Sequence, residues 1–83
     1  MVETFEQIYE RHLIRMIETR PDDYAYPLAE VPLVVMRMMG AIRRNGFNAN
    51  SPALRATAKE LGIKPTATAI RAYVLESEVK SNG

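Results

Sequence analysis

The segment that most limits how this chain can fold is Val31–Asn45, which is apolar on almost every side. Only Arg37 interrupts its apolar run before the two basic residues near its end. Pro32 fits the first turn of a helix, where a missing N–H is harmless, and Asn45-Gly46 is typical of a helix end. A helix that is apolar all round must be buried all round. The segment therefore predicts either the central helix of a tight bundle or a face used for self-association.

Three methionines lie in this segment: Met36, Met38 and Met39. Methionine is an adaptable packing group, so core packing is the expectation that fits it most simply. If one face of the helix stays uncovered, Met36 and Met39 are expected to bind a partner instead. The segment 31–45 would then form the interface of a homodimer.

Helical spacing of apolar residues predicts three further helices, at about 4–20, 52–61 and 65–77. Thr4 and Gln7 fit a capping box at the first of these, and Arg20-Pro21 ends it. Ser51-Pro52 opens the helix at 52–61, the third in the chain, with serine as the cap and proline in the first turn. Residues 21–30 are expected to form a connector, residues 47–50 a short loop, and residues 78–83 a frayed tail.

The residues expected to face the core share this spacing: Phe5, Ile8, Tyr9, His12, Leu13, Met16 and Ile17 in the first helix, Leu54, Ala58 and Leu61 in the third, and Ala67, Ile70, Tyr73 and Val74 in the fourth. No alternation typical of β-strands occurs. With 83 residues, the chain is long enough for one domain. The sequence therefore predicts an all-α fold, a compact four-helix domain whose last two helices form a helix-turn-helix-like pair.

The connector carries two tyrosines, Tyr24 and Tyr26, between prolines. Their rings can pack over the edge of the core with the hydroxyl reaching water, which is the commoner use of tyrosine. They can also bind a partner, because aromatic side chains concentrate at the centres of protein interfaces. Packing is the main expectation, and partner binding is the alternative.

Charge is unevenly distributed although the net charge is only +1. Residues 1–30 hold seven acidic and three basic residues, whereas residues 31–75 hold seven basic residues against Glu60 alone. Such asymmetry points to a charged partner for one half of the chain. The alternative is that the two halves neutralise each other within the fold or across a dimer.

The residues that catalysis needs are sparse. There is no cysteine, which excludes disulfides, thiolate metal sites and cysteine nucleophiles. His12 is the only histidine and has apolar neighbours at helical spacing, so we expect a half-buried ring rather than part of a catalytic triad. Acidic side chains do not converge as metal ligands. We expect no enzyme, no cofactor and no metal.

No signal peptide is recognisable, because the first residues are acidic where a signal would be basic. The longest mostly apolar run, residues 31–42, is shorter than the ~20 residues that a membrane helix needs. The expectation is a cytoplasmic protein without membrane contact.

The string Ala58-Lys59-Glu60-Leu61-Gly62-Ile63 has the spacing of a turn between two helices. Alanine lets a second helix cross closely, leucine fills the shared core, and glycine takes the left-handed conformation that ends a helix. This string resembles the first half of a helix-turn-helix, and the likeness covers residues 51–76. The resemblance implies a small regulatory protein that binds DNA.

The resemblance assigns the polar residues of the basic half to nucleic acid. The residues implied are Arg43, Arg44, Arg55, Lys59, Lys64, Thr66, Thr68 and Arg71. Arg55 and Lys59 would contact phosphates, and the two arginines that end the second helix would hold the backbone on the other flank. The last four residues would enter the major groove.

The second half of the motif departs from the usual pattern. Thr68 stands five residues after Ile63, where an aliphatic residue is usual, so the last helix must be rotated or begin later than in repressors. The strings 61–66 and 69–74 are also similar to the tail of small phage and prophage proteins. That resemblance implies an accessory role, so the alternative to DNA binding is a protein that binds and modulates a host protein.

Overall fold

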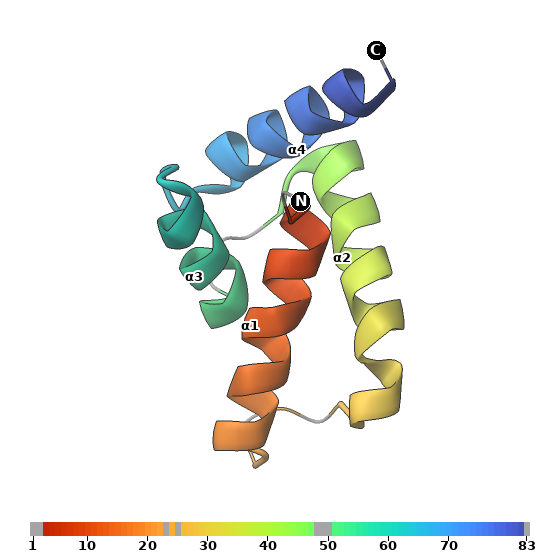
Figure 1. The fold of residues 1–83 in the computed structure, drawn as a ribbon, viewed down its shortest axis with the longest axis vertical. Coiled ribbons are helices and arrows are strands. Elements are labelled where there is room, and N and C mark those ends of the chain that lie inside the picture. Colours follow the sequence, from red (N-terminus) through yellow and green to blue (C-terminus); the bar gives the residue numbers. More distant parts are fainter. Residues whose placement is uncertain (1–2, 23, 25, 48–50, 83) are drawn as a thin grey trace.

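Four α-helices follow one another in the described part of the chain, with a short 3-10 helix before the second (Figure 1). They are α1 (Phe5–Thr19), η1 (Leu28–Glu30), α2 (Val31–Asn45), α3 (Pro52–Leu61) and α4 (Ala67–Asn82). The computed structural model describes residues 3–22, 24, 26–47 and 51–82, and these contain no strand. The expected all-α, compact four-helix class is confirmed.

The ends of α1, α2 and α3 lie at or within one residue of the expected positions. At the start of α1, the N–H of Gln7 donates to Thr4 Oγ1 at 3.2 Å and the N–H of Thr4 donates to Gln7 Oε1 at 2.8 Å. This reciprocal pair is the expected capping box. α2 ends before Gly46, which has a φ of 67°.

The expected bounds of the last helix were wrong at both ends. α4 begins at Ala67 rather than at 65, and it continues to Asn82 where a frayed tail from 78 was expected. Several residues of the expected connector, loop and tail lie outside the described residues: Asp23, Ala25, residues 48–50 and Gly83.

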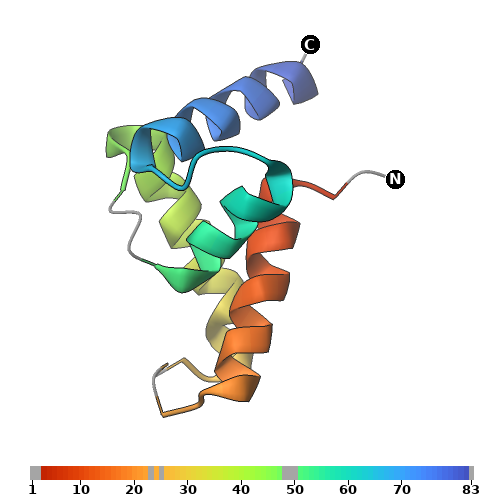
Figure 2. The same ribbon diagram turned by 90° about the vertical axis from the view of Figure 1, so that its left-hand side faces the viewer.

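α1 is the central element. α2 packs on one side of it and α3 on the other, while α4 lies across the end of α2 (Figures 1 and 2). The side chains that meet between these helices form one core: Phe5, Tyr9, Leu13 and Ile17 of α1, Val31, Val35, Met39 and Ile42 of α2, Ala53, Leu54 and Ala58 of α3, and Ile70 and Val74 of α4. Most of the residues expected to face the core are among them.

Within one copy of the chain, α2 is buried on one side only, so it is not the central helix of the bundle. The alternative expectation, a face used for self-association, stays a prediction. Val35 and Met39 are 3% and 1% exposed, whereas Leu33 and Met36 are 54% and 66% exposed. The physical reason is that the helices packed on α2 contact a single stripe of it. The proposal that Met39 binds a partner is therefore wrong, because its side chain lies in the core.

The two connector tyrosines differ. Tyr24 is half-buried against the core, and its O–H donates to Met16 Sδ at 3.4 Å. Tyr26 remains 42% exposed. Of the described helices, none has the length and hydropathy required to span a membrane.

Candidate nucleic-acid interface

The turn after α3 has the geometry that its sequence predicts. Gly62 adopts φ 75° and ψ 21°, which is the left-handed region. The N–H of Gly62 donates to the carbonyl of Lys59 at 3.2 Å, and the N–H of Ile63 donates to the carbonyl of Ala58 at 3.0 Å. These two bonds satisfy the last carbonyls of the helix as a Schellman motif does. The turn brings Ile63 against the core and leaves Lys64 exposed.

α4 departs from the helix-turn-helix pattern after this turn. α3 packs mainly on α1, whereas α4 packs mainly on α2. Ile70 and Val74 are the buried residues of α4, and Thr68, at the position where the pattern places an aliphatic residue, is exposed. The two helices therefore do not share the core residue that a helix-turn-helix uses to fix their crossing.

Thr66 has a structural role instead of the expected place in the major groove. Its Oγ1 accepts a hydrogen bond from the N–H of Ala69 at 3.2 Å, and its carbonyl accepts one from the N–H of Ile70 at 3.0 Å. This is how a threonine caps the start of a helix. Thr66 lies at this cap position because α4 begins at Ala67, later than expected.

Arg43 does not face a partner, because two carboxylates hold it. Its Nη2 lies 2.8 Å from Glu6 Oε1, and its Nε lies 3.3 Å from Glu78 Oε2. The Nε contact is an ion pair without hydrogen-bond geometry. Arg43 thus joins α1, α2 and α4, and its guanidinium, expected to contact the nucleic-acid backbone, is paired with carboxylates of the same chain. The alternative reading, in which acids of the first helix neutralise basic residues within the fold, holds at this position.

Arg71 lies next to this cluster, with its Nε donating to the carbonyl of Arg43 at 3.5 Å. Arg71 and Thr68 line a small hollow together with Asn45, Gly46, Ala67, Ala72 and Leu75. Both residues are exposed, but they face this hollow between α4 and the end of α2 rather than the surface of α3. Arg44 is exposed on α2 near Gly40.

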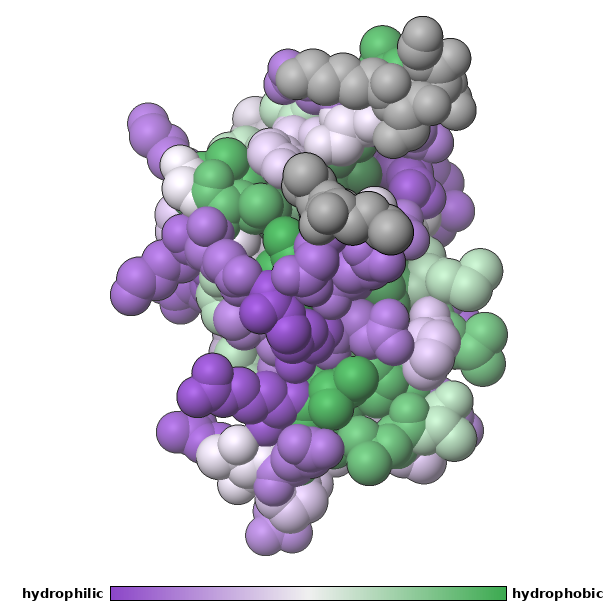
Figure 3. Space-filling model, viewed as in Figure 1, coloured by the Kyte–Doolittle hydropathy of each residue, from purple (hydrophilic) through white to green (hydrophobic). Residues whose placement is uncertain are grey.

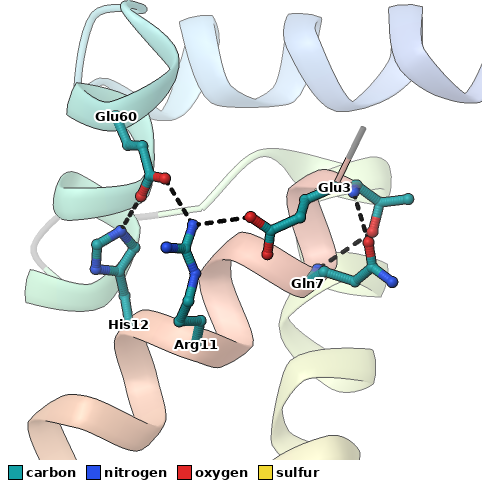
Figure 4. A network of polar contacts seen from close by, with 6 residues as sticks. Glu3, Gln7, Arg11, His12 and Glu60 are labelled. Carbon is teal, nitrogen blue, oxygen red and sulfur yellow. Dashed lines mark hydrogen bonds and ion pairs between the residues drawn. The ribbon is translucent and has the colours of Figure 1, made fainter. Parts of the chain in front are cut away.

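A second polar cluster joins α1 to α3 (Figure 4). Glu60 accepts hydrogen bonds from Arg11 Nη2 at 2.6 Å and contacts His12 Nε2 at 2.5 Å, while Arg11 also lies 3.2 Å from Glu3. The hydrogen bond from Arg11, followed by that from His12, lowers the pKa of Glu60. The His12 side chain is 19% exposed. The histidine therefore links two helices, and the carboxylate of Glu60, the acidic residue of α3, is already paired with side chains of α1.

The remaining cations of α3 gather around a shallow hollow. The hollow is lined by Arg55, Ala56 and Lys59 of α3 and by Ile63 and Pro65 of the turn. Ala56 also borders a second hollow between α3 and the end of α1, to which Arg15 and Arg20 contribute. The two hollows therefore adjoin.

We call the cations around these adjoining hollows the basic face, and it consists of Arg15, Arg20, Arg55, Lys59 and Lys64. All are exposed, and none forms an ion pair with another described residue. In Figure 3, hydrophilic side chains project on the left-hand side of the molecule, where α3 and the lower half of α1 lie. Exposed, unpaired cations beside shallow hollows can bind phosphate groups.

The structure thus brings together three of the residues expected to bind nucleic acid, namely Arg55, Lys59 and Lys64. It adds Arg15 and Arg20, which the sequence analysis missed. The signal was present, because Arg15 lies one helical turn from His12 and Thr19 on the same side of α1. That α3 packs against this side of α1 became known only from the structure.

Comparison with protein-family models, curated proteins and solved structures finds no match. Within the described residues, no group of three or more histidine, cysteine or acidic side chains could hold a metal ion. The interpretation of the site therefore depends on its own geometry and charge.

Proposed function

We propose that this protein is a small regulatory protein that binds DNA through the basic face, chiefly by contacts to phosphates. The observation that supports this most directly is the grouping of five exposed cations, none in an ion pair with a described acidic residue, on neighbouring parts of α1, α3 and the turn. Phosphate contacts of this kind supply most of the affinity in non-specific DNA binding. Among the described carboxylates beside them in sequence, Glu18 and Asp22 make no ion pair with these cations, and Glu60 pairs with Arg11 and His12 instead.

Contacts to phosphates are favoured over readout of bases in the major groove. Groove readout by the last helix would need Thr66, Thr68 and Arg71 to project together from a helix packed against α3. Thr66 caps α4, and the other two residues face a separate hollow. We therefore expect weak sequence preference and strong salt dependence.

The test is a fluorescence-anisotropy titration of a short duplex DNA at about 50 mM and about 200 mM salt. If all five cations contact phosphates, the logarithm of affinity falls with the logarithm of salt with a slope of up to about −4.5. The double variant Arg55→Ala/Lys59→Ala is expected to lower the magnitude of that slope by about 2 and to weaken binding at low salt at least about tenfold.

Arg44→Ala is the matched control, because it removes an exposed arginine outside the basic face. It is expected to bind DNA as the unchanged protein does. Loss of binding in this control, with normal binding by the double variant, would contradict the basic face and place the contact with DNA at the end of α2. Absence of any binding at low salt would reject DNA binding altogether.

The alternative function is binding to a host protein, and one observation favours it. Tyr26, Leu28, Leu33 and Met36 are large apolar side chains that stay exposed between the connector and the middle of α2. Apolar residues of this size are typical of protein interfaces. Under this alternative, Tyr26→Ala/Met36→Ala abolishes retention of a stoichiometric partner from lysate, whereas Arg55→Ala/Lys59→Ala does not.

A further inference from the structure

One side of α2 faces away from the rest of the molecule and carries an ordered pattern of side chains. We call it the outer face of α2; it comprises Glu30, Leu33, Met36, Arg37, Gly40 and, at its far end, Arg44. These residues are three or four positions apart, so they share one side of the helix. Glu30 belongs to this side because its backbone is already helical, with φ −93° and ψ −7°. In Figure 3, hydrophobic side chains protrude along the right-hand edge, which α2 forms.

Gly40 has no explanation within a single copy of the chain. Glycine in the middle of a helix weakens it relative to alanine, because its backbone loses more freedom on folding. A Cβ added at Gly40 would meet nothing closer than Arg44 Nη1 at 3.5 Å, which is an ordinary contact with a flexible side chain. Its φ is not positive, so no turn requires it either. A missing side chain on an exposed helix face is what a close approach by another chain needs.

The charges on the outer face of one α2 are complementary to those on the outer face of a second, antiparallel α2. Glu30 and Arg37 lie about one turn on either side of Leu33, and both are exposed without an ion pair in the described residues. If a second α2 runs antiparallel with Leu33 against Leu33, each Glu30 lies within one residue, about 1.5 Å along the axis, of the level of an Arg37. A two-fold axis thus makes two equivalent ion pairs flanking an apolar centre.

The same register also accounts for Gly40. Gly40 lies ~10 Å along the helix from Leu33 on the side away from the connector. In the antiparallel arrangement it lies opposite the partner's segment before α2. That segment carries Tyr26 and Leu28, which are 42% and 53% exposed. The space left by the missing Cβ is therefore where bulky apolar residues of a second copy arrive.

We propose that the protein forms a two-fold symmetric homodimer through the outer face of α2, with the helices antiparallel and centred on Leu33. One helix face is small beside the ~1,600 Å² of a typical stable interface, so the dimer is weak, with a dissociation constant of about 10–100 µM. α2 and α3 lie on different sides of α1, so dimerisation leaves the basic face open (Figures 1 and 2). The dimer does not depend on the proposed DNA binding.

The test is sedimentation equilibrium of the full chain from about 1 µM to about 500 µM, combined with a charge swap. Glu30→Arg and Arg37→Glu each place like charges opposite one another and are expected to weaken the dimer at least about tenfold. The double variant Glu30→Arg/Arg37→Glu restores the two pairs in reverse and is expected to recover the original dissociation constant. Gly40→Leu is expected to abolish the dimer by filling the space.

Glu18→Arg is the control, because it makes the same charge change as Glu30→Arg at an exposed site on α1. It is expected to leave the dimer unchanged, and circular dichroism verifies that each variant remains helical. A monomer over the whole concentration range overturns the proposal, and would leave the apolar face to a different protein. A dimer that ignores the single reversals, or one that the double swap fails to restore, overturns the proposed register.

Discussion

Two glycines of this chain show that the same residue type can have opposite consequences for stability. Gly62 has a φ of 75° and nothing within 4 Å of the place where a Cβ would be. Any penalty for a side chain there is therefore conformational rather than steric. Gly40 has ordinary helical geometry within α2 and room for a methyl group.

The Gly62→Ala variant is expected to lower the free energy of unfolding by about 1 kcal/mol, since alanine is strained in the left-handed region. The Gly40→Ala variant is expected to raise it by about 0.5–1 kcal/mol, because alanine favours the helix. Urea titrations at a protein concentration of a few micromolar measure both. Equal effects of the two substitutions would contradict the backbone conformation of Gly62.

Tyr9 makes stability depend on pH in the alkaline range. Its side chain is 2% exposed, and burial raises its pKa to about 12. Below pH ~10 the phenol is neutral in both the folded and the unfolded chain, so its full contribution to the free energy of unfolding is present. Between pH ~10 and ~12 only the unfolded chain loses the proton, and stability therefore falls as pH rises.

Urea unfolding at several pH values between about 9 and 12 measures this loss. The wild-type protein is expected to lose about 2 kcal/mol more over this range than Tyr9→Phe, which retains the other tyrosines and the buried ring. Parallel curves for the two proteins would show that Tyr9 is accessible to solvent when it ionises.

At the scale of single elements, α2 is a helix whose composition hides which side is buried. Met39 is 1% exposed and Met36 is 66% exposed, although they lie only three positions apart in the same mostly apolar helix. Met39→Ala is expected to lower the free energy of unfolding by about 2–4 kcal/mol through the cavity that it leaves. Met36→Ala is expected to change it by less than about 0.5 kcal/mol in dilute solution.

Thermal or urea unfolding monitored by circular dichroism compares the two variants. Because a domain of this size has little stability in reserve, Met39→Ala can be unfolded already at room temperature, which is the same outcome in a stronger form. A large effect of Met36→Ala in dilute solution would mean that the outer face of α2 is covered within one copy.

The sequence predicted the elements where a local signal marks their ends. Pro52 and Gly62 mark the ends of α3, and Pro32 and Gly46 mark those of α2, because first-turn prolines and left-handed turns depend on neighbouring residues only. Ser51 stands at the cap position of α3, but its side chain makes no capping hydrogen bond there. The end of α4 has no such signal before Asn82, and the helix was therefore predicted too short.

Contacts between distant residues were beyond a single sequence. The spacing of Glu6, Arg43 and Glu78 contains nothing that joins them, so Arg43 was assigned to nucleic acid. Apolar residues occur on almost every side of α2, so the sequence alone did not show which side is buried. The cations Arg55 and Lys59 were found because they share a helix face, whereas Arg15 required knowledge of which helix packs beside it.

At the scale of the whole molecule, Arg43 connects residues from three helices. Both of its ion pairs are partly open to solvent, with side-chain exposures of 37% for Arg43, 41% for Glu6 and 46% for Glu78. Pairs of this kind contribute little, since water and salt screen them.

The Arg43→Gln variant is therefore expected to lower the free energy of unfolding by less than about 1 kcal/mol, and by still less in about 0.5 M salt. Urea titrations in low and high salt provide the measurement, with Arg37→Gln as a control for an arginine outside the cluster. A loss of several kcal/mol that persists in high salt would show that the cluster is a buried part of the core.

The central position of α1 also bears on how the chain acquires its shape during synthesis. When residues up to Asn45 have left the ribosome, α1 can pair with α2, but the flank that carries His12 and Met16 still lacks its neighbour from residues 52–61. The pair of helices formed first therefore exposes apolar surface on this flank until residues 46–61 have also been synthesised. Any delay in translation at that point lengthens the time during which this apolar flank can aggregate or bind chaperones.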